Sequence, residues 1–181
     1  MIPPINYCSA CGAAIAVRVP AGDSRPRHVC DACGTVHYRN PLVVAGTLPV
    51  WQDQVLLCRR AIEPQAGLWT LPAGFMEVRE TVAEAALRET DEETGAKVEL
   101  EDLYCMVSVP HISQVHVIFR ARLVGLEFSP GEETAEVALF REAEVPWEQI
   151  AFRSITLALR HFFADRRAGQ FILHTDDIPA P

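Results

Sequence analysis

A charged run that follows Gly74 carries the side chains best suited to chemistry in this chain of 181 residues. Its spacing is glycine, five residues, glutamate, seven residues and then Arg-Glu-Thr-Asp-Glu-Glu-Thr-Gly-Ala. At about 100° per residue in a helix, Glu92 and Glu93 lie on either side of Glu89 on one face. Hard divalent cations prefer such carboxylate oxygens. The spacing therefore predicts a glycine-bearing loop and a short helix that together hold divalent cations.

A solvated acidic helix face is the alternative interpretation of these three glutamates. Like charges three and four residues apart destabilise a helix by a few tenths of a kcal/mol per pair. Arg88 and Gly95 stand at fixed spacings from the three glutamates and from the Gly74 loop. This combination favours metal ligation over the alternative. On the opposite face we expect a weakly apolar stripe that packs on the core, formed by Ala83, Leu87, Thr90 and Thr94.

Four cysteines near the N-terminus form a second pattern. They are two Cys-x-x-Cys pairs separated by 18 residues, namely Cys8, Cys11, Cys30 and Cys33. This spacing is typical of a zinc ribbon, in which four thiolates surround Zn²⁺ and leave no position open for a reacting water. Disulfide bonds are the competing interpretation, although a cytosolic compartment keeps thiols reduced. His28 or His37 could replace a cysteine ligand, and we expect Cys58 and Cys105 to be ordinary buried thiols.

The first pattern resembles the Nudix box, which reads glycine, five residues, glutamate, seven residues and then Arg-Glu-U-X-Glu-Glu-X-Gly-U, where U is Ile, Leu or Val. Every charged and glycine position matches. Thr90 and Ala96 occupy the two U positions, and Arg79 stands where many members have glycine. The resemblance implies an α/β/α sandwich with a mixed sheet. It also implies hydrolysis of a diphosphate linked to a nucleoside, with Mg²⁺ or Mn²⁺.

The resemblance covers nearly the whole chain. The ribbon and three further runs, 58–64, 67–77 and 109–114, resemble the zinc-ribbon Nudix subgroup that includes plant chloroplast FAD and ADP-ribose pyrophosphatases and bacterial relatives. It implies a zinc ribbon over residues 1–39 and a Nudix hydrolase domain over residues 40–181. NADH pyrophosphatases of this subgroup carry Ser-Gln-Pro-Trp-Pro-Phe-Pro-x-Ser after the box, whereas the stretch 107–114 here has one proline and no tryptophan. We therefore expect ADP-ribose or FAD as substrate, with release of AMP, and NAD(H) as the alternative.

The resemblance implies roles for the residues of the box. The metal ligands would be Glu89, Glu92, Glu93 and the carbonyl of Gly74. We expect Arg88 to orient Glu89 through a charge-assisted hydrogen bond. Glu80 either supports the metals through water or stabilises the loop.

Residues outside the box are assigned in the same way. For the base that activates water we favour Glu136 and then Glu133, with a solvated loop as the alternative for both. The expected substrate contacts are Arg60, Glu63 and Phe75. Arg60 could instead pair with Glu63 on the surface. We expect Trp69 in the core and assign no catalytic role to His111 or His116.

Composition excludes several other classes of function. The formal net charge of -8 disfavours broad electrostatic binding to nucleic acid. No apolar run approaches the length of a membrane span, and the N-terminus does not read as a secretory signal. We expect a cytoplasmic enzyme that acts on a small nucleoside diphosphate compound, and a homodimer is compatible with the resemblance. The second functional class is a ligand-sensing or nucleic-acid-docking module, but such proteins commonly lose box carboxylates that this chain keeps.

The elements that must position these residues follow from hydrophobic periodicity and turn signals. We expect strands over residues 42–51, 55–60, 67–71, 98–109, 115–124 and 136–140. We expect the box helix over residues 81–94 and an amphipathic closing helix over residues 152–167.

Overall fold

The computed structural model describes residues 4–180, which divide into two compact units that meet between Pro41 and Leu42. The boundary expected from the sequence lies two residues before this division. The N-terminal unit holds the four cysteines of the ribbon pattern, and the C-terminal unit holds the box residues.

The N-terminal unit is built on a three-stranded antiparallel sheet of β1 (Ile15–Arg18), β2 (Arg27–Cys30) and β3 (Val36–His37). In each Cys-x-x-Cys turn, the N–H of the following glycine, Gly12 or Gly34, donates a hydrogen bond of 2.8 Å to the carbonyl of the first cysteine. Both glycines have a φ of 75°, a left-handed conformation that glycine adopts without strain. Among residues 4–41 of this unit, the buried ones are Cys8, Val29 and Cys30. A core of this size cannot stabilise a fold by itself.

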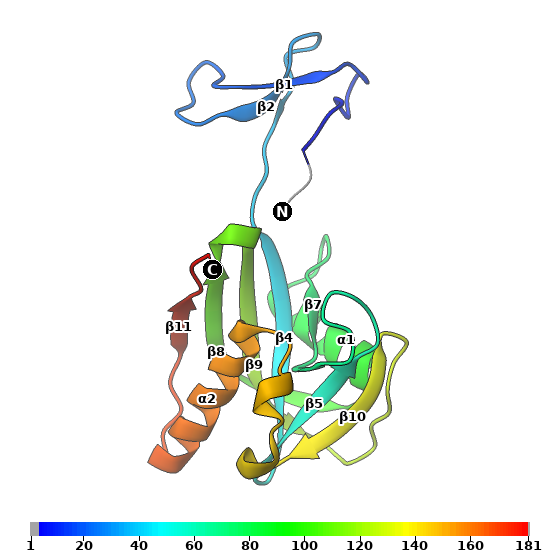
Figure 1. Cartoon of the computed structure of the whole chain (residues 1–181), viewed down its shortest axis with the longest axis vertical. Coiled ribbons are helices and arrows are strands. Elements are labelled where there is room, and N and C mark those ends of the chain that lie inside the picture. Colours follow the sequence, from blue (N-terminus) through cyan, green and yellow to red (C-terminus); the bar gives the residue numbers. More distant parts are fainter. Residues whose placement is uncertain (1–3, 181) are drawn as a thin grey trace. The chain divides into compact units, whose positions relative to one another are not determined.

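The C-terminal unit is organised around an eight-stranded mixed sheet with the order β10-β5-β4-β9-β8-β11, to which β6 and β7 add beside β5 and β4 (Figure 1). The pairs β4–β9 and β8–β11 are parallel, and the other pairs are antiparallel. The strands are β4 (Leu42–Trp51), β5 (Gln54–Arg60), β6 (Trp69–Thr70), β7 (Ala73–Phe75), β8 (Val98–Val109), β9 (Gln114–Leu123), β10 (Thr134–Phe140) and β11 (His174–Asp177). The helices are α1 (Val82–Thr94) and α2 (Arg153–Ala168), with short 3-10 turns η1 (Pro110–Ile112), η2 (Glu142–Glu144) and η3 (Trp147–Gln149).

The two α-helices cover different faces of the sheet, because side chains alternate along β4. Ala45 packs with Ala85 and Ala86 of α1, whereas Leu48 belongs to the large core that includes Leu159 and Phe162 of α2. The expected α/β/α sandwich with a mixed sheet is therefore confirmed. Neither α-helix in residues 4–180 combines the length and the apolar composition that crossing a membrane requires.

The buried face of α1 differs from the stripe expected from the sequence. The helix buries Ala85, Ala86, Thr90 and Thr94, whereas Leu87 is 39% exposed. The small alanines lie against Ala45 and shift the buried face of the helix away from Leu87. As a result, Glu89 and Glu93 lie at the edge of the buried face and are only partly exposed.

Thr90 occupies a box position where an aliphatic residue is usual, and its hydroxyl is satisfied inside the core. It donates a hydrogen bond of 2.7 Å to the carbonyl of Ala86 and accepts one of 2.7 Å from the hydroxyl of Thr47. Thr47 and Thr90 are both fully buried. A buried threonine at this position is therefore matched by a second threonine on β4.

Candidate active site

The carboxylates of α1 reach a cavity because β4 and β5 separate along their length. β4 pairs with β5 only at Val50 and Trp51, while β7 takes the edge of β4 from Val44 to Gly46. The chain passes from β7 through a short loop directly into α1. The box residues therefore lie where the two strands part.

The start of α1 is specified by a capping box. The hydroxyl of Thr81 accepts a hydrogen bond from the N–H of Glu84, whose side chain accepts one from the N–H of Thr81. Gly95 closes the helix with a φ of 60°. In the preceding loop Arg79 has a φ of 75°, a left-handed conformation that glycine adopts more easily than arginine. Arg79 therefore adopts a backbone conformation that suits the glycine usual at this box position.

Arg88 organises the acidic residues of the box. Its Nε and Nη2 donate to the two oxygens of Glu80 at 3.1 and 2.8 Å, and its Nη1 donates to Glu89 at 2.7 Å and to Glu92 at 3.0 Å. Glu80 also accepts the N–H of Glu77, and the hydrogen bond from Arg88 lowers the pKa of Glu80. Both oxygens of Glu80 are thus engaged in holding the loop and the arginine, which favours the loop-stabilising alternative for this residue.

Gly74 leaves room for the side chain of Glu89. A Cβ atom at position 74 would collide with the carboxylate of Glu89. Gly74 is paired with Ala45 in the β4–β7 ladder, so its backbone cannot move away easily. Glycine suits this position because the Glu89 carboxylate packs against its backbone. A left-handed backbone is not the reason, because the φ of Gly74 lies outside that region.

Glu93 is the most deeply placed acid of the box. Its Oε2 accepts hydrogen bonds from the N–H of Ala73 at 3.1 Å and from the thiol of Cys58 at 3.5 Å. Burial raises the pKa of Glu93 to about 7 and raises the pKa of Glu89 as well. Burial also raises the pKa of the Cys58 thiol well above its usual value, so this group stays protonated and donates.

These carboxylates border a cavity of about 780 Å³ in the C-terminal unit. Its polar lining includes Arg60, Glu63, Gln114, His116, Glu132 and Glu133 besides the box residues Glu77, Arg88, Glu89, Glu92 and Glu93. Its apolar lining includes Val44, Ile62, Phe75, Ile112, Phe152 and Ile155. A cavity of this volume matches the usual size of small-molecule sites.

The expected substrate contacts all line this cavity. Phe75 is 51% exposed, and Glu63 and Arg60 also border the space. Arg60 donates to the carbonyl of Pro64 at 2.7 Å and lies 5.3 Å from the ring centre of Phe152. Among the described residues it forms no ion pair with Glu63, which argues against the surface-pair alternative.

Glu136, the favoured candidate for the base, lies elsewhere. It pairs with Arg59 across the β10–β5 ladder, at 3.6 Å from Arg59 Nη1, and does not line the cavity. Directly opposed residues of antiparallel strands point to the same face of the sheet, so Glu136 lies on the face of Arg59. Arg60, the next residue on β5, points to the other face, which borders the cavity. A bulge between Thr134 and Glu136 sets this register. Glu132 and Glu133 border the cavity instead.

Other expectations concern residues that the sequence left out of the site. Trp69 is 7% exposed and packs edge-on against Phe140 at 4.9 Å, so its place in the core is confirmed. His111 is exposed and lies outside the cavity lining. Gln114 and His116 line the cavity although no site role was expected for them. Gln114 and His116 are two residues apart on β9, so the sequence places them on one face of the strand. It does not show that this face borders the cavity.

Divalent cations fit the donor set of this site. Burial raises the pKa of the Glu89 and Glu93 carboxylates, and hard cations prefer oxygen ligands of this type. Within residues 4–180 the hydrogen-bond donors to Glu93 are the N–H of Ala73 and the thiol of Cys58, and neither carries charge. Glu92 is 60% exposed and shares Arg88 with Glu89.

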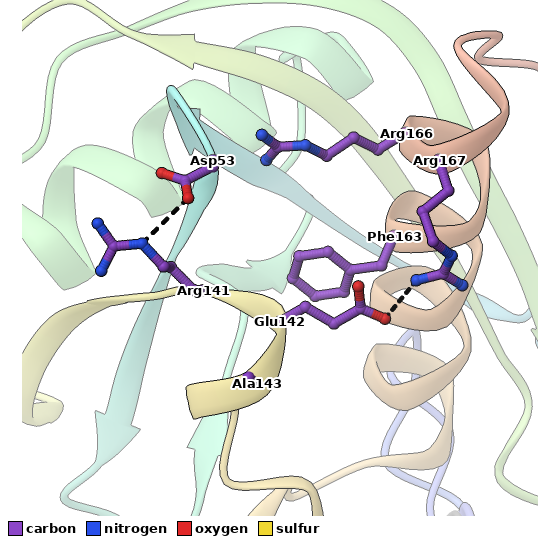
Figure 2. A pocket seen from close by; sticks show the side chains of 7 residues that line it. All are labelled: Asp53, Arg141, Glu142, Ala143, Phe163, Arg166 and Arg167. Carbon is purple, nitrogen blue, oxygen red and sulfur yellow. Dashed lines mark hydrogen bonds and ion pairs between the residues drawn. The ribbon is translucent and has the colours of Figure 1, made fainter.

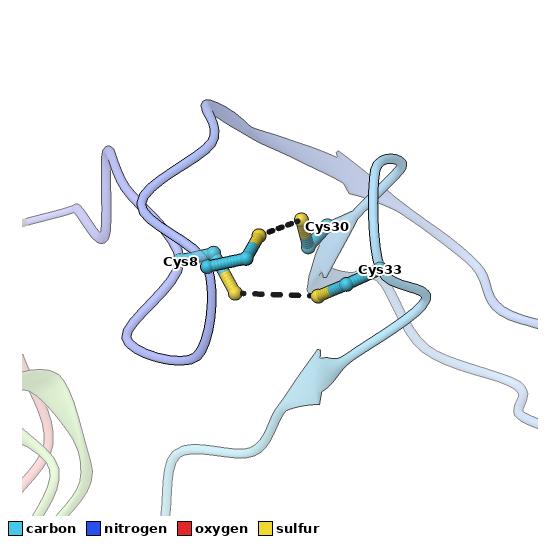
Figure 3. Close-up of side chains that lie close together, drawn as sticks. Cys8, Cys30 and Cys33 are labelled. Carbon is cyan, nitrogen blue, oxygen red and sulfur yellow. Dashed lines mark hydrogen bonds between the residues drawn. The ribbon is translucent and has the colours of Figure 1, made fainter.

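The four cysteines of the N-terminal unit form a second candidate metal centre (Figure 3). Their sulfur atoms all lie within 4.8 Å of one another, with Cys8 3.6 Å from Cys33 and Cys11 3.5 Å from Cys30. These separations are far longer than the S–S bond of about 2.05 Å, so the disulfide interpretation is wrong. They are close to the roughly 3.8 Å between ligands of a tetrahedral zinc site with bonds of about 2.3 Å. His37 lies outside the four ligands, with Nε2 3.3 Å from the sulfur of Cys8.

A smaller, open cavity of about 370 Å³ lies between η2, the β4–β5 turn and the end of α2 (Figure 2). Its charged side chains form the pairs Arg141–Asp53, at 3.0 Å, and Arg167–Glu142. Arg166 and Arg167 belong to the last turn of α2, where cations stabilise the helix dipole. These ordinary roles explain the charges, and the cavity lacks a cluster of carboxylates.

Comparison with known proteins agrees with this geometry. The family model described as Nudix N-terminal, a zinc ribbon, matches residues 6–39, and the model described as NUDIX domain matches residues 41–165. A crystal structure of a NUDIX hydrolase from Nitrosomonas europaea is similar to this chain with a TM-score of 0.93 and 50% identity, covering 96% of this chain and 99% of the other.

The chain is also similar to relatives that carry different names. An ADP-ribose pyrophosphatase of Methanocaldococcus jannaschii is 30% identical over 115 residues, which are 60% of this chain and 67% of that protein. An NAD-capped RNA hydrolase, NudC, of Photobacterium profundum is 28% identical over 149 residues, 81% of this chain and 53% of that protein. The chain thus spans about half to two thirds of the length of these relatives.

Proposed function

This chain belongs to the Nudix family, and we propose that it is a divalent-metal-dependent hydrolase of the diphosphate bond in a nucleoside diphosphate derivative. The proposed substrate is ADP-ribose or FAD, and the products are AMP together with ribose 5-phosphate or FMN. Water supplies the oxygen that ends on the released phosphate, so no other reactant is needed.

One observation carries the proposal, namely the excess of carboxylates in the cavity. Six glutamates border it besides Glu63, which are Glu77, Glu89, Glu92, Glu93, Glu132 and Glu133, against only Arg60 and Arg88. Arg88 is already occupied by Glu80, Glu89 and Glu92. A diphosphate would be repelled from such a surface. Bound Mg²⁺ or Mn²⁺ would supply the positive charge that both the carboxylates and the diphosphate require and would activate water.

The protein's own residues would hold this arrangement in place. We propose that Glu89, Glu92 and Glu93 are metal ligands, with the carbonyl of Gly74 as a further oxygen. Arg88 would keep Glu89 oriented through the hydrogen bond of 2.7 Å. This role is that of a positioning group, because Glu80, Glu89, Glu92 and the carbonyl of Phe75 already engage all three guanidinium nitrogens of Arg88.

Glu133 is our candidate for the base that accepts a proton from the attacking water. It borders the cavity, and its charge contributes to the raised pKa of Glu89. The carbonyl of Glu133 accepts the N–H of Ala61 at 2.8 Å, and Gly131 packs against the backbone of α1, so the loop is anchored on both sides. An anchored loop suits a group that must meet a water at a defined position.

The substrate preference rests on the segment after β8. It forms η1 and the start of β9, and Ile112 and Gln114 line the cavity. This is the stretch in which the chain lacks the proline-rich signature of NADH pyrophosphatases, so the wall that a substrate meets differs. NAD(H) is the second candidate substrate, favoured by the similarity to proteins named NAD-capped RNA hydrolase.

Steady-state hydrolysis of ADP-ribose, FAD, NAD and NADH, each with Mg²⁺ and with Mn²⁺, tests the proposal. We expect kcat/KM for ADP-ribose or FAD to exceed that for NADH by about tenfold or more, which is about 1.4 kcal/mol in transition-state binding. An NADH value more than about tenfold above both would overturn the substrate assignment. No hydrolysis of any compound with either cation would overturn the enzymatic assignment.

A further inference from the structure

His116 is a buried histidine in the wall of the cavity, and both of its ring nitrogens have partners. It is 8% exposed, with Nδ1 2.8 Å from the hydroxyl of Ser154 and Nε2 3.0 Å from Oε1 of Gln114. Ser154 belongs to the first turn of α2, and Gln114 is the first residue of β9. The three side chains therefore form a chain of hydrogen bonds that ends at the cavity.

The direction of these hydrogen bonds follows from the chemistry of the three groups. The Gln114 oxygen can only accept, so Nε2 of His116 must carry the proton, and Nδ1 must accept from the hydroxyl of Ser154. A neutral ring is required for this pattern, and burial lowers the pKa of His116. In this arrangement Nε2 of His116 holds the Gln114 amide by its oxygen, and Ser154 supports the ring from its other nitrogen.

The amide nitrogen of Gln114 is left without a partner among the described residues. It is not closed off in the protein, because Gln114 borders the cavity. The neighbouring lining is apolar and partly aromatic, with Val44 beside His116 in the β4–β9 register and Phe75 beside Val44 in the β4–β7 register. Ile112, Phe152 and Ile155 complete this wall.

We propose that Gln114 determines specificity for the nucleobase of the substrate, donating an N–H to an acceptor atom on the base, and that His116 and Ser154 position its amide. A base has flat apolar faces and hydrogen-bonding edges, and this wall offers rings, aliphatic side chains and one oriented donor. A phosphate is a poorer match for the side chains beside Gln114 and His116, because Val44, Phe75, Ile112 and Ile155 are uncharged. The inference rests on the proposed function and names its base-recognition site.

Direct binding separates this inference from catalysis. Calorimetric titration with AMP, GMP, CMP and UMP, with saturating Mg²⁺ to offset the acidic lining, compares the wild type with Gln114→Leu, Gln114→Glu and the exposed-site control Gln170→Leu. We expect the wild type and the control to bind one nucleotide best. We expect Gln114→Leu to weaken that affinity by about tenfold and to narrow the difference between bases. Gln114→Glu should be at least as weak, because a carboxylate cannot donate.

Steady-state kinetics and a double-mutant cycle test the positioning role. With the diphosphate substrate, Gln114→Leu should raise KM by about tenfold and leave kcat within about threefold. His116→Leu, or His116→Asn if leucine prevents folding, should reproduce the loss, and adding it to Gln114→Leu should cause no further loss.

Each result has one reading. Wild-type affinity in Gln114→Leu or Gln114→Glu would overturn the donor role, and fully additive losses in the double variant would overturn positioning by His116. A wild type that binds none of the four nucleotides would overturn the base site. A wild type that binds a nucleotide through Gln114 yet hydrolyses no diphosphate would support this inference and contradict the proposed function.

Discussion

Glu89 and Glu93 are acids placed where the protein disfavours negative charge. Burial raises the pKa of both, and the partners available within the chain compensate only in part, since Arg88 reaches Glu89 but not Glu93. Strongly perturbed acids that border a cavity are typical of functional sites. The imbalance is resolved if a cation binds there, which is the residue-scale basis of the proposed chemistry.

The close approach of Gly74 to Glu89 leads to a prediction about Gly74→Ala. The added Cβ would collide with the carboxylate, which is the flexible end of a side chain, so the carboxylate must move while the backbone stays. We expect the free energy of unfolding to change by less than about 1 kcal/mol. We expect kcat/KM to fall by about tenfold or more, because displaced ligands lose transition-state stabilisation. Urea unfolding and diphosphate hydrolysis measure the two quantities.

Gly125→Ala is the matched control, since an added Cβ there meets only the side chain of Glu127 and lies outside the cavity. It should leave activity unchanged. If Gly74→Ala keeps wild-type turnover, close packing of Gly74 and Glu89 has no functional role.

Some residues of the site could be predicted from the sequence and others could not. The box acids could, because their spacing is local and a helix brings them together. Glu136 was misplaced because a bulge at the start of β10 decides which strand residues face the cavity. Gln114 and His116 were missed because their importance depends on α2, which supplies Ser154 from 38 residues beyond His116.

At the scale of elements, local signals specify α1 better than the strands around it. Thr81, Glu84 and Gly95 mark its ends, and the helix runs as expected from the sequence. β7 and β11 were not expected. β7 has three residues, and β11 has the polar sequence His-Thr-Asp-Asp, so neither shows the alternation that identifies a strand. Their pairing with β4 and β8 is a tertiary effect.

β11 is tied to α2 through Asp165, and this leads to a prediction about pH. Asp165 Oδ2 accepts hydrogen bonds from Nε2 of His174 at 2.8 Å, the hydroxyl of Tyr104 at 3.1 Å and the N–H of Ile172 at 3.3 Å. Burial acts to raise the pKa of Asp165, but these hydrogen bonds outweigh it and lower the pKa. The folded pKa lies below the unfolded one, so the stabilisation is complete above about pH 4 and is lost as pH falls through the folded value.

Asp165→Asn should therefore reduce the free energy of unfolding by about 1 to 2 kcal/mol at pH 7 and flatten its decline below about pH 4. Urea unfolding between pH 3 and pH 7 gives both quantities. Asp177→Asn, at an exposed position on β11, is the control and should match the wild type. Equal stability of Asp165→Asn and wild type at pH 7 would show that this anchor contributes nothing.

At the scale of the whole molecule, the two units depend on different sources of stability. The C-terminal unit has extensive apolar cores, whereas the N-terminal unit buries little besides two cysteines and a valine. Four thiolates bound to Zn²⁺ can supply the folding free energy that such a unit lacks. The zinc ribbon could be predicted from its two Cys-x-x-Cys pairs. The mixed sheet could be predicted from the hydrophobic patterns of its strands and helices.

We predict about one zinc per chain, bound by Cys8, Cys11, Cys30 and Cys33. Cys30→Ser should lose this zinc and unfold the ribbon, while diphosphate hydrolysis stays within about threefold, since the box lies in the other unit. Metal analysis and activity assays provide the two readings. Cys105→Ala, which removes a buried thiol outside the cluster, should keep its zinc. Less than about 0.2 zinc per wild-type chain after expression with ample zinc would contradict the assignment.

The most direct test of the central claim is the turnover of Glu92→Gln and Glu93→Gln with saturating Mg²⁺. Each change keeps the shape of the side chain and removes a ligand charge, so we expect a loss of roughly a thousandfold in kcat, or about 4 kcal/mol. Asp91→Asn is the control on the same helix, because Asp91 is exposed and pairs with Lys97 outside the cavity, and it should stay within about twofold of wild type. Losses of less than about tenfold in both glutamine variants, with the fold intact, would mean that the metals are held elsewhere.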